Sequence, residues 1–173
     1  MSNYINSVVN RFETYKLLGE KCFDQLTDED IQWQYNEASN SIAITVKHIV
    51  GNMHSRFTNF LTEDGEKPWR HRDTEFENAY TNKLDLIKAW EKGWQCVFEA
   101  IEPITEDMLE NTVFIRNEKH TIIEALNRQL AHYAYHIGQI VYVARMLKGN
   151  DWKSLSIPKG KSEEFNKNYI PKH

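Results

Sequence analysis

Residues 122–147 read IIEALNRQLAHYAYHIGQIVYVARML, and this stretch decides the fold. Apolar side chains recur along it at the spacing that places them on one face of an α-helix. Thr121 and Glu124 form a T-x-x-E capping box before it, and Gly149 follows its end, as is typical of helix boundaries. We therefore predict a helix here whose main apolar stripe is Ile122, Leu126, Tyr133, Ile137, Ile140 and Ala144.

Three further stretches have the same helical periodicity: residues 4–26, residues 41–61 and residues 82–101. Asn40 or Ser41 can cap the second of them. Four amphipathic helices in a chain of 173 residues predict an all-α protein, a four-helix bundle. The second connection, residues 62–80, is long and polar. We therefore do not expect a simple up-down-up-down order of the helices.

The segments between these helices differ in character. Residues 27–40 begin with Thr-Asp-Glu-Asp, a helix start signal that predicts a short extra turn of helix. Residues 112–115 are β-prone and precede a turn-like Arg-Asn-Glu-Lys, so they form either a small hairpin or an extended loop. The sequence thus predicts a bundle over residues 1–150 and a C-terminal tail, 151–173, that packs on the bundle or frays from it.

Composition limits the partners of the chain. Its net charge is −4 with 27% charged residues, and no basic run is present, so we expect no nucleic-acid partner. The first twelve residues lack the pattern of a signal peptide, and no apolar stretch is long enough to span a bilayer. We expect no membrane partner and a cytoplasmic location. In that compartment the only two cysteines, Cys22 and Cys96, would be reduced structural thiols.

Two of the seven histidines, His132 and His136, stand four residues apart on the last predicted helix. Side chains at this spacing lie on the same helix face and can bind one metal ion. Gln129 and Gln139 share the same flank of the apolar stripe, and buried polar groups of this kind need a partner such as a metal or a polar cavity. Tyr133 follows His132 where a zinc protease has Glu, which argues against that class. An exposed pair without a metal is the alternative.

A third ligand is not chosen by periodicity. His48 shares a helix face with mostly small residues, as the wall of a cavity would require. His54 lies nearer the edge of the main apolar stripe but shares its face with Lys47 and Thr58, which suggests solvent. From the residues alone, both histidines stay candidates.

Two motifs resemble those of a known family. SIAITVKH, residues 41–48, and LAHYAYHIGQI, residues 130–140, are similar to the motifs on helices two and four of the DinB/YfiT-like metalloenzymes. Members of that family typically carry Arg before the Gly-Gln of the second motif, where this chain has Ile137. GEKPWR from Gly65 and SIPKGKS from Ser156 resemble an uncharacterised bacterial branch.

The resemblance implies a DinB/YfiT-like four-helix bundle in which His48, His132 and His136 hold one divalent metal ion, and it favours His48 over His54. We expect zinc or nickel, with iron, manganese or copper as alternatives. Known members of the family include S-transferases that use bacillithiol or mycothiol and a maleylpyruvate isomerase. Homodimers are common among them, so a homodimer is expected here.

Three histidine ligands leave a metal with open positions, which is the pattern of catalytic sites. The expected function is that of a metal-dependent transferase or hydrolase, in particular a bacillithiol-type S-transferase that joins a low-molecular-weight thiol to an electrophilic small molecule. Its catalytic residues are not identified. The side chains expected to contact the histidines or the substrate are Asn52, Gln129, Tyr135 and Gln139. The alternative is a non-catalytic metal-binding or dimerising bundle in a stress response.

Overall fold

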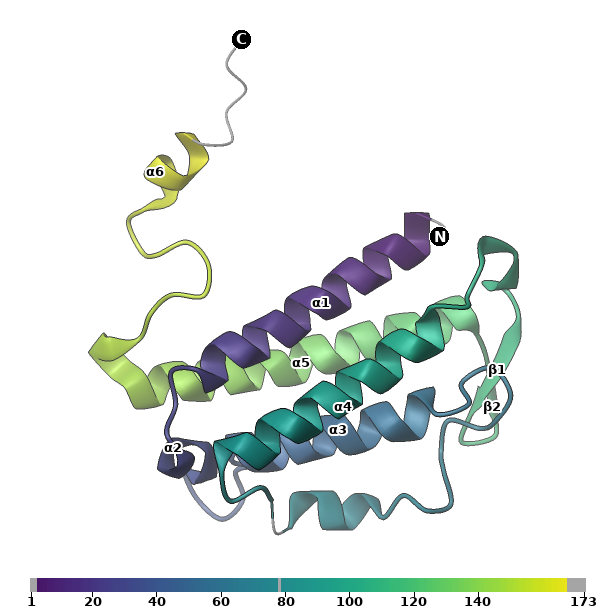
Figure 1. Ribbon diagram of the computed structural model, residues 1–173, viewed down its shortest axis with the longest axis horizontal. Helices are drawn as coiled ribbons and strands as arrows, with labels where there is room; N and C mark the ends of the chain where they lie inside the picture. The colour runs from purple at the N-terminus through teal and green to yellow at the C-terminus, as the bar shows by residue number, and fades with distance from the viewer. Residues whose placement is uncertain (1–2, 78, 168–173) are drawn as a thin grey trace.

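The computed structural model describes residues 3–77 and 79–167. Four long helices form a bundle, and this confirms the predicted all-α fold (Figure 1). They are α1 (Asn3–Phe23), α3 (Ile42–Phe57), α4 (Lys83–Ile101) and α5 (Ile122–Lys148). The short elements are the helices α2 (Asp28–Gln32) and α6 (Ser162–Lys167), the 3-10 turns η1 (Arg72–Phe76), η2 (Glu106–Met108) and η3 (Gly149–Asp151), and the strands β1 (Thr112–Ile115) and β2 (Glu118–Thr121).

The long second connection predicted that the helices do not follow a simple up-down-up-down order, and they do not. α3 and α4 run in the same direction, and η1 lies on the return path between them (Figure 1). The two ends of this path are tied to different ends of the bundle. The Gly65 N–H donates to the Phe114 carbonyl in the hairpin at 2.8 Å, and the Lys83 N–H donates to the Asp28 carboxylate at 2.8 Å. The connection therefore lies along α3, where it can cover that helix.

Local capping explains where the helices begin and end. Thr121 and Glu124 form the predicted capping box of α5, and Ser41 accepts the N–H of Ile44 at the start of α3. α3 ends at Phe57, four residues before the predicted end at residue 61. The physical reason is that Thr58 is extended and Asn59 has a φ of +49°, a conformation that no α-helix contains.

The two short predicted features are both present. α2 is capped by Thr27, whose side chain accepts the Asp30 N–H. β1 and β2 pair as an antiparallel hairpin with Ile115 opposite Glu118. Arg116 and Asn117, between them, have φ values of +57° and +62°, as a tight hairpin turn requires. The hairpin reading of residues 112–121 is therefore correct, and the extended loop is not.

The core lies between the four helices and is rich in aromatic rings. Trp90 and Trp94 of α4 are fully buried and pack edge-to-face, and Trp94 also contacts Phe12 and Tyr133. The predicted apolar stripe of α5 is buried along its whole length. Cys22 is a buried free thiol as expected, and burial raises its pKa to about 12, so the thiol stays protonated.

The C-terminal tail begins on the bundle and then leaves it. Trp152 and Leu155 pack against the core, whereas α6 is exposed and projects away from the four helices (Figure 1). The end of the predicted tail, residues 168–173 with His173, lies outside the described residues. Across residues 3–77 and 79–167, no helix combines the length and the apolar character needed to cross a membrane.

Candidate metal centre

The fold brings three histidines from two helices to one point. His48 on α3 faces His132 and His136 on α5. The Nε2 atom of His132 lies 3.3 Å from that of His48 and 3.1 Å from that of His136. Two nitrogen ligands of one tetrahedral zinc ion are about 3.4 Å apart when each lies about 2.1 Å from the metal. The two distances to His132 therefore match those between ligands of one ion, and possible ligand atoms of all three rings lie within 4.8 Å of one another.

The other ring nitrogens determine which atoms carry protons. Nδ1 of His48 lies 2.8 Å from a carboxylate oxygen of Glu75, and Nδ1 of His136 lies 2.8 Å from Oε1 of Gln139. Both oxygens can only accept, so each Nδ1 carries an N–H. In the neutral form of these two rings, the Nε2 atoms of His48 and His136 present lone pairs toward His132.

Two lone pairs that point at the same histidine need a positive centre between them. A proton on His132 is disfavoured, because burial and the charges of His136, His48, Arg56 and Arg70 lower its pKa to about 3. Even a neutral His132 with its proton on Nε2 could donate to only one of its two neighbours. A divalent metal ion would accept a lone pair from all three rings, so the residues present fit a metal.

Sequence reasoning missed one partner of the centre, Glu75 of η1. Its side chain is buried, and it accepts two hydrogen bonds from Arg70, at 2.7 and 3.0 Å, besides the one from His48. Burial alone would raise the pKa of the Glu75 carboxyl, but the bonds from His48 and Arg70 and the Arg70 charge hold it below the ordinary value. The carboxylate is therefore ionised and orients the His48 ring.

Gly51 is the one local signal that could have revealed Glu75. A Cβ atom at position 51 would lie 2.3 Å from the Glu75 carboxylate, far inside van der Waals contact. A glycine inside a helix costs stability relative to alanine, and in α3 the close approach of Glu75 gives it a structural reason. The sequence does not say what approaches, because Glu75 lies in an irregular segment without periodicity.

The predicted neighbours of the histidines fall into two groups. Asn52 and Gln129 are buried beside the centre, and Asn52 accepts a hydrogen bond from the Tyr133 hydroxyl at 3.2 Å. Gln139 is exposed, but its Oε1 atom accepts the hydrogen bond from Nδ1 of His136. Tyr135 is 64% exposed, and its ring packs edge-to-face against that of His136. All four therefore lie near the centre or in contact with it. His54 is not part of the cluster.

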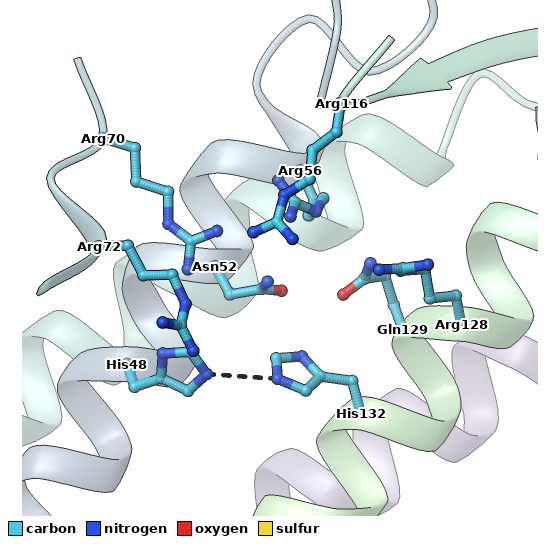
Figure 2. A pocket seen from close by; sticks show the side chains of 9 residues that line it. All are labelled: His48, Asn52, Arg56, Arg70, Arg72, Arg116, Arg128, Gln129 and His132. Carbon is cyan, nitrogen blue, oxygen red and sulfur yellow. Dashed lines mark hydrogen bonds between the residues drawn. The ribbon is translucent and has the colours of Figure 1, made fainter. Parts of the chain in front are cut away.

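A cavity of about 610 Å³ opens directly beside His48 and His132. Figure 2 shows that its walls carry the side chains of Asn52, Gln129 and five arginines. These are Arg56, Arg70, Arg72, Arg116 and Arg128. The sequence shows no basic patch, because these arginines are scattered between positions 56 and 128 and only the fold brings them together.

Comparisons with known proteins agree with the fold. A family described as "Protein of unknown function (DUF1572)" matches residues 1–161. A crystal structure of a DinB-like protein from Bacillus cereus ATCC 10987 is similar, with a TM-score of 0.63 and 18% identity, covering 83% of this chain and 90% of that one. At that identity the likeness concerns the fold. No curated protein matches the sequence.

Proposed function

The chain belongs to the DUF1572 family of proteins of unknown function and has a DinB-like fold, and from that premise we propose that it is a divalent-metal-dependent enzyme. Its metal ion is held by Nε2 of His48, His132 and His136. The observation that carries the proposal is the convergence of these three nitrogens, with His48 and His132 at the wall of an open cavity. Zinc or nickel is the proposed ion, since both accept three imidazole ligands.

The arrangement suits catalysis better than a structural role. Structural zinc sites are closed by four protein ligands, whereas catalytic sites have three and keep a position for water or substrate. Here three ligands are offered, and two of them line the cavity. A bound divalent ion would supply Lewis acidity there, which lowers the pKa of a thiol or a water molecule that reaches it.

The chain's own residues hold this site in place. Glu75 fixes the tautomer and the rotation of His48, and Gln139 does the same for His136. Phe76 stacks on the face of His48, with ring centroids 5.0 Å apart, and so shields that ring. The proposed reaction joins a low-molecular-weight thiol of the bacillithiol type to an electrophilic small molecule in the cavity. The thiol loses its proton, its sulfur bonds to the electrophilic carbon, and the bond that breaks there is that of a leaving group or of an opened ring.

The metal content of purified protein tests the site. Untagged wild-type protein, His132→Ala and the matched control His54→Ala are analysed by inductively coupled plasma mass spectrometry. His54 lies on the same helix as His48 but outside the cluster. We expect close to one metal ion per chain in the wild type and the control, and a strong loss in His132→Ala. Equal metal in all three proteins would refute the site.

A turnover assay then tests the enzyme itself. Chelator-stripped and metal-reloaded protein is mixed with an electrophile and a panel of thiols that includes bacillithiol, and consumption of the thiol is followed. We expect turnover that returns with the metal. A stoichiometric metal without metal-dependent turnover across the panel would favour a non-catalytic metal-binding bundle instead.

A further inference from the structure

The cavity beside the histidines is strongly basic although the whole chain is acidic. The residues that line it are five arginines, two histidines, one asparagine and one glutamine, without a carboxylate or an apolar side chain among them. The net charge of the chain is −4. A concave surface of one charge sign concentrates the field within it and attracts the opposite charge. This local reversal of sign indicates a ligand that is an anion.

Three of the five arginines already pair with acidic side chains, although these provide only two carboxylates. Arg70 forms its two bonds to Glu75, and Arg56 and Arg116 both contact Glu66, at 3.1 and 2.8 Å. In this way the two buried guanidiniums, those of Arg56 and Arg70, are held at the floor of the cavity.

Arg72 and Arg128 have no carboxylate partner among residues 3–77 and 79–167. Arg72 is placed over the Phe76 ring, 5.2 Å from its centroid, and Phe76 in turn stacks on His48. Arg128 extends from α5, one turn before His132. Figure 2 shows the two side chains on opposite sides of the cavity, both on the same side of the histidines as the open space. Two uncompensated guanidiniums thus flank the approach to the centre.

Gln129 adds an independent observation that a ligand belongs there. Its side chain is 3% exposed, and its Oε1 atom has no hydrogen-bond partner in the described part of the chain. Figure 2 shows this oxygen directed into the cavity, toward Asn52. An unpaired buried acceptor is costly, so a donor such as a hydroxyl or amide N–H of a ligand would satisfy it.

We propose that this cavity binds a small organic anion, with its carboxylate or phosphate group held by Arg72 and Arg128 and a hydrogen-bond donor facing Gln129. Guanidinium groups bind both kinds of oxyanion in a forked geometry. The inference rests on the proposed function in one respect: the anion is the anchoring group that places a substrate beside the three histidines. It names the substrate class of that site as anionic and polar.

The experiment measures binding of two probes, inorganic phosphate and succinate, by isothermal titration calorimetry at constant ionic strength. Sodium chloride is the reference anion. The proteins are wild type, Arg72→Gln, Arg128→Gln and Arg11→Gln, each with its metal content determined. Arg11 is an exposed residue of α1 outside the cavity, so this control loses the same charge elsewhere. The two probes distinguish a phosphate ligand from a carboxylate ligand.

We expect at least one probe to bind more tightly than chloride to wild type and to Arg11→Gln. Binding should be about tenfold weaker in each cavity variant, as expected for the loss of one charged hydrogen-bonding partner, with the metal content unchanged. Equal binding in all four proteins, or binding no tighter than that of chloride, would overturn the inference. A short single-stranded oligonucleotide is added as a third probe, and tighter binding of it through the same arginines would also overturn it.

The two proposals fail in separate ways. If His132→Ala keeps its metal while Arg72→Gln loses phosphate or succinate, the metal site is wrong and the anion site stands. If His132→Ala loses its metal while both arginine variants bind the probes as wild type does, the anion site is wrong and the metal site stands.

Discussion

Replacing Gly51 by alanine should weaken metal binding without touching a ligand. The new Cβ would lie 2.3 Å from Oε1 and 2.8 Å from Cδ of Glu75. Ordinary contact begins near 3.4 Å, so the carboxylate must move by about 1 Å. The 2.8 Å hydrogen bond to His48 then lengthens beyond the range of a hydrogen bond. Loss of such an orienting partner typically lowers metal affinity about 10- to 100-fold, or about 1.4–2.7 kcal/mol.

The same substitution has an opposite, local effect on the helix. Alanine in place of glycine inside a helix stabilises it by about 0.5–1 kcal/mol. Gly138→Ala on α5 is the matched control, because a Cβ there meets nothing within 4 Å. We expect Gly138→Ala to raise the melting temperature by about 1–4 °C and to leave metal affinity unchanged. Gly51→Ala should show a smaller gain or a loss of stability, because the three hydrogen bonds of Glu75 are disturbed.

Competition titration against a chromogenic chelator measures the affinity of each variant, and thermal unfolding of the metal-free proteins measures their stability. If Gly51→Ala bound metal as tightly as wild type and were as stable as Gly138→Ala, Glu75 would not act on the centre through His48. The assignment of Glu75 as a positioning residue would then be wrong.

Two further predictions concern stability. Burial and neighbouring charges lower the pKa of His132 from 6.5 to about 3, so the unfolded chain binds more protons than the folded one between these pH values. The free energy of unfolding of the metal-free protein should therefore fall as the pH drops from 6.5 to about 3. In urea unfolding, His132→Asn should show a smaller change of this free energy with pH than wild type, and an equal change would contradict the prediction. We also propose that residues 1–150, with Trp152 and Leu155 packed on them, fold without α6. Deletion of residues 159–173 should change the free energy of unfolding by less than about 0.5 kcal/mol. Truncation after Asn150, which also removes Trp152 and Leu155, should lower it by more than about 1 kcal/mol. Equal effects of the two truncations in urea unfolding would refute the proposal.

Much of the fold could be predicted because its signals are local. The capping box of Thr121 and Glu124, the stripe on α5 and the hairpin turn each depend on residues a few positions apart. The pairing of His132 with His136 is of the same kind, since one turn of helix places them together. The apolar periodicity predicts an end of α3 that is four residues too far along the chain, because nothing in it marks the positive φ of Asn59.

The sequence by itself determined four amphipathic helices, the caps of two of them and one histidine pair, and its likeness to a known family pointed to His48. Only the tertiary structure placed His48 opposite that pair, laid Glu75 against Gly51, and collected five arginines around one cavity. The physical reason is that periodicity reports which face of a helix is apolar, but not which distant segment covers it. Glu75 and Arg72 lie in an irregular connection, whose path along α3 is set by packing at both of its ends.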